Sequence, residues 1–243
     1  MGISFWDNLV LNLEKIYYTE IIWLIAMIIA LYIGIKNCRK ETNYILLLLY
    51  VLFGIIFITS TIIIRNSPVI PRLNKPPITE LLNMFFSLIE ISIFLYLFHS
   101  FFVSKFENKL IFITWIIDAL FILSISIYIY SNEIYVRRII ELSMLVTSIN
   151  FVILFFLSLF YFYKLLAGQI QQTGNLIYNP VFWIIGGLFF YALVSLPVLL
   201  LSSNIAMSNK SLYYILYSIH YISISILYLC IAKAFSCKAP ITT

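Results

Sequence analysis

Seven long apolar stretches, separated by short polar spacers, form the main pattern of this chain. At a rise of 1.5 Å per helical residue, a bilayer core of about 30 Å requires about 20 predominantly apolar residues. The spacers carry most of the charged residues. We therefore predict seven membrane-spanning helices at about residues 17–35, 44–64, 81–103, 110–130, 139–166, 181–201 and 212–235.

Composition agrees with this pattern. Of the 243 residues, 63% are apolar or aromatic and 10% are charged, whereas about 25% of the residues in soluble domains are charged. These values exclude a soluble globular, disordered, collagen-like or disulfide-rich secreted protein. We expect one all-α domain, a polytopic seven-helix bundle, in contact with the lipid of a plasma membrane, the inner membrane if the protein is bacterial.

The first 16 residues combine apolar positions at helical spacing with charges on the opposite face. They predict a short interfacial helix with Trp6 at headgroup depth; a frayed N-terminus is the alternative. We do not expect a signal peptide, because no basic region precedes the apolar residues and Asp7 and Glu14 interrupt them.

The basic residues around the first span indicate an orientation. The first span has Lys36, Arg39 and Lys40 after it and Lys15 before it. Basic residues favour the cytoplasmic side, so we expect the N-terminus outside and the C-terminus in the cytoplasm. The net charge of +5 comes from membrane-edge residues suited to anionic headgroups, and we expect no nucleic-acid partner.

Two acidic residues, Glu90 and Asp118, fall near the middle of their predicted spans. An ionisable side chain at that depth costs roughly 2.5–3.5 kcal/mol on insertion scales. We therefore expect Glu90 and Asp118 to handle a ligand, a proton or an ion. The alternative is a neutral carboxyl that donates one structural hydrogen bond.

Polar residues recur three and four positions apart on four helices, and this spacing places them on one helical face. They predict a polar interior shared by these helices, although interhelical hydrogen bonding alone would also use such residues. The stripes are Asn83, Ser87 and Glu90; Thr114 and Asp118; Ser143, Thr147 and Asn150; and Tyr213, Tyr217 and His220. Our candidate ligand- or proton-binding residues are Glu90, Asp118, His220, Asn150, Ser87 and Tyr217.

For His220 two partners are open, a nearby carboxylate that favours its protonated form or a backbone carbonyl that binds it neutral. Glu90 and Asp118 lie on neighbouring predicted helices and could meet.

The sixth span has features that affect its backbone. Asn179 is expected to cap the helix, with Pro180 at the first helical position. Gly186 and Gly187 permit close helix approach, and Pro197 removes a backbone hydrogen bond and predicts a kink.

The longest spacer, 65–80, carries prolines at positions 68, 71, 76 and 77. This content favours a stiff, extended segment, which we expect across the outer mouth of the bundle.

Motifs for known chemistry are missing from the sequence. Cys38, Cys230 and Cys237 lack metal-binding spacing, and no hydrolase or nucleotide-binding motif is present. We expect no metal, no cofactor and no enzymatic activity.

Residues Asn179-Pro180-Val181-Phe182-Trp183, followed by Gly187 and Tyr191, resemble the sixth-helix pattern of seven-helix membrane modules. Such modules occur at the N-termini of some bacterial sensor histidine kinases and also as stand-alone proteins. The similarity covers about 13 residues and implies a sensory or accessory role. No kinase domain follows the last span in this sequence, so we expect action through a separate partner protein.

Three functions follow as hypotheses. The first is a sensory or accessory membrane module that acts through a signalling partner. The second is a small proton-coupled solute transporter that uses the buried carboxylates. The third, an intramembrane enzyme acting on a lipid or isoprenoid, requires two carboxylates close enough to serve as acid and base.

Overall fold

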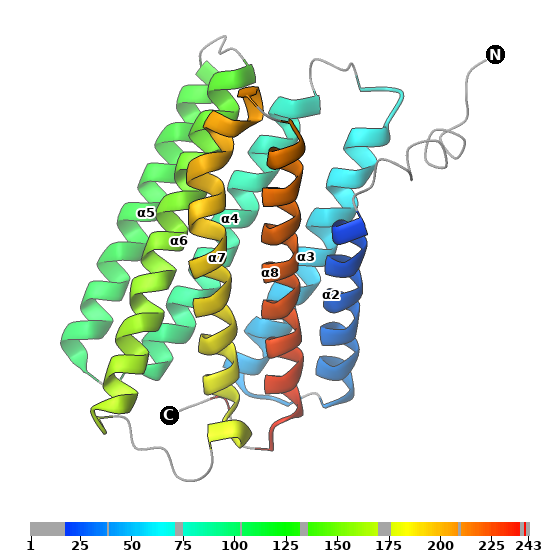
Figure 1. Ribbon diagram of the computed structural model, residues 1–243. Coiled ribbons are helices and arrows are strands. Elements are labelled where there is room, and N and C mark those ends of the chain that lie inside the picture. Colours follow the sequence, from blue (N-terminus) through cyan, green and yellow to red (C-terminus); the bar gives the residue numbers. More distant parts are fainter. Residues whose placement is uncertain are drawn as a thin grey trace.

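The computed structural model describes residues 18–37, 39–70, 75–102, 104–131, 136–169, 176–208, 210–238 and 241. These residues form seven long helices and one short 3-10 helix (Figure 1). All seven long helices are long and apolar enough to cross a membrane, which confirms the predicted seven-helix bundle. They are α2 (Tyr18–Lys36), α3 (Thr42–Asn66), α4 (Lys75–Phe101), α5 (Lys105–Ser131), α6 (Val136–Leu166), α7 (Pro180–Ser208) and α8 (Lys210–Ser236), with η1 (Leu176–Tyr178) before α7.

The predicted spans match these helices to within a few residues at most ends. The start of α4 differs, because the helix begins at Lys75 and includes Pro76 and Pro77. The prediction of an extended segment was therefore wrong for these two prolines. The first helical turn tolerates proline because its amide groups need no partner within the helix. The predicted interfacial helix at residues 1–16 lies outside the described residues.

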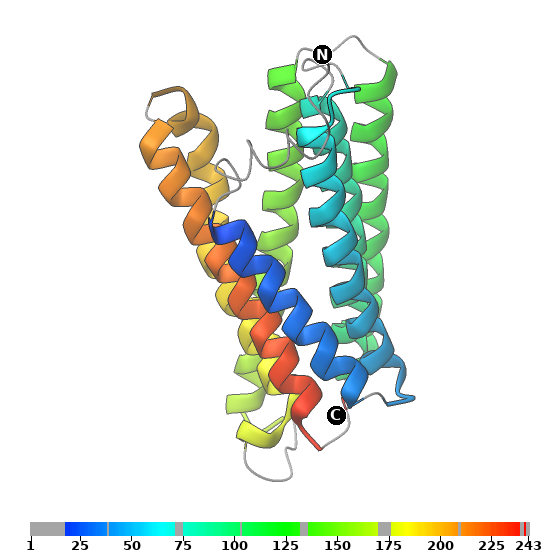
Figure 2. The same cartoon turned by 90° about the vertical axis from the view of Figure 1, so that its right-hand side faces the viewer.

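The helices form two groups. Helix α8 packs between α2 and α7 in the first group, and α4 packs between α3 and α5 in the second. Helix α6 contacts both α4 and α7, and α2 contacts α3, so the groups are joined on both sides. Figure 2 shows the first group tilted against the second, so that the groups meet near the end of α8 and diverge toward the start of α2 and the end of α3. We call these two ends of the bundle the sealed end and the mouth end.

The C-terminal residues tie the two groups together at the sealed end. The side-chain amide of Asn43, at the start of α3, donates to the carbonyl of Ile241 at 2.6 Å and to the Ser100 hydroxyl at 3.0 Å. The amide of Ile241 donates to the Glu41 carboxylate at 2.9 Å. Arg39 donates to the carbonyl of Cys237. These bonds connect the end of α8 to the start of α3.

Within the first group, α7 and α8 pack closely at Gly187. A Cβ atom at this position would lie 2.7 Å from the Cβ of Cys230, so only glycine fits without movement. At Gly186 a Cβ would meet no atom within 4 Å. The expected close approach therefore occurs at the second glycine alone. The predicted cap is also present, since Asn179 Oδ1 accepts a 2.8 Å hydrogen bond from the amide of Val181. Helix α7 continues through Pro197.

Candidate ligand-binding cavity

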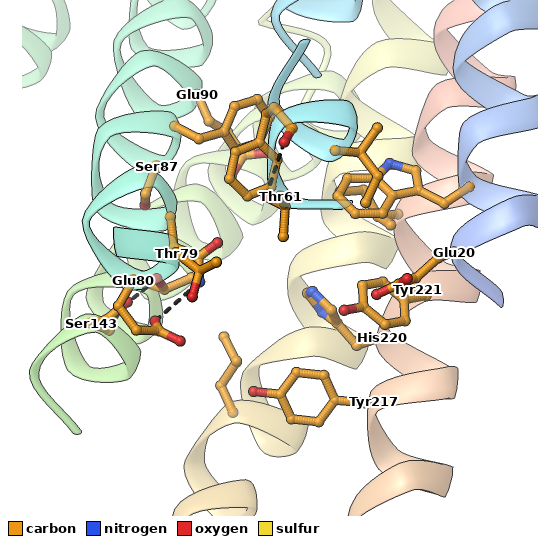
Figure 3. Close-up of a pocket in the computed structure, with 18 of the residues that line it drawn as sticks. Glu20, Thr61, Thr79, Glu80, Ser87, Glu90, Ser143, Tyr217, His220 and Tyr221 are labelled. Carbon is orange, nitrogen blue, oxygen red and sulfur yellow. Dashed lines mark hydrogen bonds between the residues drawn. The ribbon is translucent and has the colours of Figure 1, made fainter. Parts of the chain in front are cut away.

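A cavity of about 460 Å³ lies between the two helix groups, toward the mouth end. Its lining comes from α2, α3, α4, α6, α7 and α8. In the close-up, Glu80, Ser87 and Ser143 face Tyr217 and His220 across the open space (Figure 3). The volume lies in the range of sites for small molecules.

Of the lining residues on α4, Glu90 lies farthest from the mouth end, and it is 5% exposed. Its Oε1 accepts a 2.6 Å hydrogen bond from the Tyr50 hydroxyl of α3. Among the described residues, no donor contacts the other carboxylate oxygen, Oε2. Glu90 therefore presents a buried carboxylate with one oxygen available to a molecule in the cavity.

The polar stripe of α4 lines the cavity as predicted. Asn83, Ser87 and Glu90 all contribute to the lining. The stripe of α6 lies beside it, where Thr147 reaches the cavity. Asn150 sits behind the lining and donates a 2.7 Å hydrogen bond to the Ser87 hydroxyl. Asn150 thus positions Ser87.

Helix α8 contributes Tyr217 and His220 to the opposite wall. The Nδ1 atom of His220 lies 2.9 Å from the Ser195 hydroxyl of α7, and Ser195 in turn lies 3.2 Å from the Ser223 hydroxyl. The sequence left a carboxylate or a backbone carbonyl open as the partner of His220, and the described residues show the Ser195 hydroxyl in place of both. A serine hydroxyl can donate or accept, and this one can satisfy either tautomer of the imidazole.

Asp118 does not belong to the cavity. The predicted polar interior included α5, but this helix packs on the outside of the bundle against α4 and α6. Asp118 is 3% exposed, and neither carboxylate oxygen has a hydrogen-bond partner in the described part of the chain. Its stripe neighbour Thr114 donates to the carbonyl of Leu110 within α5. The structure therefore does not support a joint Glu90–Asp118 site.

An ion pair at the mouth end was missed in the sequence. Glu20, 1% exposed, starts α2, and Arg65 ends α3; the guanidinium Nη1 lies 3.1 Å from Glu20 Oε1. Both residues line the cavity. Consecutive membrane spans run in opposite directions, so the start of one and the end of the next lie at the same membrane surface. This rule places Glu20 and Arg65 at one surface and could have predicted the pair. No comparable pattern pointed to Tyr50.

Aromatic side chains form a continuous arc around the cavity. Neighbouring rings in the arc have centroids 4.6 to 6.4 Å apart, within or close to the usual range for interacting rings. All six rings line the cavity. In order they are Phe86 of α4, Phe57 of α3, Trp23 of α2, Tyr221 and His220 of α8, and Tyr191 of α7.

The described residues contain no group of three or more His, Cys, Asp or Glu side chains arranged to hold a metal ion. Comparisons of the chain with protein-family models, curated proteins and solved structures find no match. Functional inference therefore rests on the cavity and its lining.

Proposed function

We propose that this chain is a sensory or accessory module of the plasma membrane that binds a small solute and acts through a separate partner protein. The observation that carries the proposal is the position of the cavity. It lies between two helix groups that diverge at the mouth end, where the Glu20–Arg65 ion pair links α2 to α3, and that are also joined by hydrogen bonds at the sealed end.

A solute that contacts both walls stabilises the arrangement in which the walls are closest. Binding can shift a conformational equilibrium only through such a difference in affinity between states. In this protein the angle between the two helix groups changes when the mouth narrows. The hydrogen bonds of Asn43 and Arg39 join the two groups at the sealed end. A change in the angle between the groups therefore also rearranges the surface at the sealed end. A partner bound there receives the signal.

In this proposal the sealed end faces the cytoplasm. Lys36, Arg39 and Lys40 flank this end of α2 and α3, and basic residues favour that side of the membrane. The solute consequently enters from the outer face.

Proton-coupled transport is the second candidate, favoured by the buried carboxylate at the deep end of the cavity. Of the lining residues on α4, Glu90 lies nearest the sealed end, and its donor Tyr50 is outside the lining. A transporter would open the sealed end in alternation with the mouth, and Glu90 would exchange its proton during the change.

Co-purification from native membranes in mild detergent, followed by mass spectrometry, tests the leading proposal. We expect one partner protein in stoichiometric yield. The double variant K105E/K109E, at the sealed end, should lose the partner, because these lysines lie at the start of α5 on that face. The matched variant R138E, on an exposed residue near the start of α6 at the mouth end, should retain it.

Recovery of the chain without a partner would contradict the sensory proposal. Solute uptake into proteoliposomes, driven by a pH gradient and lost in E90Q, would then establish transport.

A further inference from the structure

We infer that the cavity binds an organic ammonium ion, with the cationic nitrogen between the Glu90 carboxylate and the aromatic arc. This inference rests on the proposed function and names the class of its solute. Charge, ring geometry and depth support it independently.

The lining carries more negative than positive charge. Glu20, Glu80 and Glu90 are its acidic residues. Its basic residues among those described are Arg65 and His220, and His220 is bonded to the neutral Ser195 hydroxyl. Arg65 pairs with Glu20. Glu80 accepts a 3.0 Å hydrogen bond from the neutral amide of Asn83, and within the described ranges neither Glu80 nor Glu90 forms an ion pair. Charge balance thus favours a cation over an anion or a neutral solute.

The aromatic arc accounts for the organic character of the ligand. The face of an aromatic ring attracts a cation through its quadrupole, and the attraction grows when water is excluded. Phe86 lies one turn before Glu90 on α4, and its ring stacks on Phe57 at 4.6 Å. The ring of Trp23, 4% exposed, continues the wall on α2. These rings suit an ammonium group with apolar substituents better than a strongly hydrated metal ion.

The depth of Glu90 explains why this carboxylate receives the cation. It is 5% exposed and has one oxygen without a described partner. A carboxylate in such surroundings is costly without a counter-charge. An ammonium ion that enters from the mouth supplies this charge and replaces the lost hydration.

Calorimetric titration of the full chain in nanodiscs of zwitterionic lipid tests the ligand class, with empty nanodiscs as the blank. Benzyltrimethylammonium is the first probe. Choline and its neutral isostere 3,3-dimethylbutan-1-ol form a pair that differs in charge at nearly constant shape. We expect both cations to bind and the neutral alcohol to bind at least tenfold more weakly than choline.

Three variants locate the site. E90Q should raise the Kd of benzyltrimethylammonium at least tenfold, and F57L should raise it several-fold through loss of a ring. D118N is the matched control, because it removes a buried carboxylate outside the cavity, and its Kd should equal that of the wild type. F57L keeps the test informative if E90Q does not fold.

Equal affinity for choline and its neutral isostere, or binding that neither E90Q nor F57L weakens, would overturn the assignment of an ammonium ligand. So would the absence of binding by both cations. These results would leave the sensory proposal intact, because that proposal is tested by partner recovery. If the chain binds cations through Glu90 but is recovered without a partner protein, the ammonium assignment stands and the sensory proposal fails.

Discussion

The hydroxyl of Tyr50 on α3 donates a 2.6 Å hydrogen bond to the carboxylate of Glu90 on α4. Both side chains are buried, and the bond joins neighbouring helices at the deep end of the cavity. The pair therefore fixes the position of the carboxylate that we propose as the ligand-binding group.

Replacing this tyrosine tests the bond. In Y50F the carboxyl of Glu90 loses its donor, and an unsatisfied buried polar group costs about 1–3 kcal/mol. We expect a lower apparent melting temperature in detergent than for Y44F. Tyr44 is equally buried, but its hydroxyl donates at 2.8 Å to the backbone carbonyl of Gly34, a neutral acceptor. Equal stability of Y50F and wild type would show that the bond contributes nothing.

Two adjacent glycines of α7 provide a test of helix packing. In G187A the added methyl lies 2.7 Å from the Cβ of Cys230, and overpacking of this kind costs about 1–3 kcal/mol. In G186A the methyl meets no atom within 4 Å, and alanine raises helix propensity by up to about 1 kcal/mol. Thermal unfolding should show G187A destabilised and G186A unchanged or stabilised. The reverse order would contradict the packing of α7 on α8.

Asp118 should be dispensable. Its carboxylate is buried against α4 and α6 without a described partner, and such a group costs stability. D118N should therefore unfold at the same or a higher temperature than wild type. It should also leave binding and partner recovery unchanged. A clear loss of cation binding or of partner recovery in D118N would show that α5 carries a second functional site.

The thiol of Cys237 reports on the sealed end. Burial raises the pKa of this thiol above its ordinary value, although the positive charges of Lys233 and Arg39 oppose the shift. The thiolate is the reactive form, so a raised pKa reduces its fraction at neutral pH. In a background without the other two cysteines, alkylation should be slow at pH 7.5 and should accelerate above about pH 8.5.

Loosening the C-terminal segment should reverse this behaviour. N43A removes the hydrogen bonds to Ile241 and Ser100, and greater exposure of Cys237 returns its pKa toward the ordinary value. We expect several-fold faster alkylation at pH 7.5. The control T59A, on the mouth half of α3, removes a hydroxyl bonded within its own helix and should react like the parent. Identical rates for N43A and T59A would contradict the tie at the sealed end.

The sequence predicted the spans well because each requires a long apolar run. It also predicted the inward face of α4, since Asn83, Ser87 and Glu90 recur four and three positions apart in a mostly apolar helix. It could not place Asp118. These helices carry apolar residues on all their faces, so the sequence pattern does not show which helices pack against each other. Tyr50 was missed because the sequence does not distinguish one aromatic residue from the others in an aromatic-rich span.

Access to the cavity tests the central claim most directly. Thr147 of α6 lines the cavity, whereas Ser158, on the same helix and fully buried, lies toward the sealed end. T147C and S158C, each in a cysteine-free background, are treated in right-side-out and inverted vesicles with a membrane-impermeant thiol reagent. We predict that T147C reacts only from the face that carries the start of α2 and the end of α3, and that S158C reacts from neither. Reaction of T147C from the opposite face, or from neither face, would contradict a solute-binding cavity that opens at the mouth end.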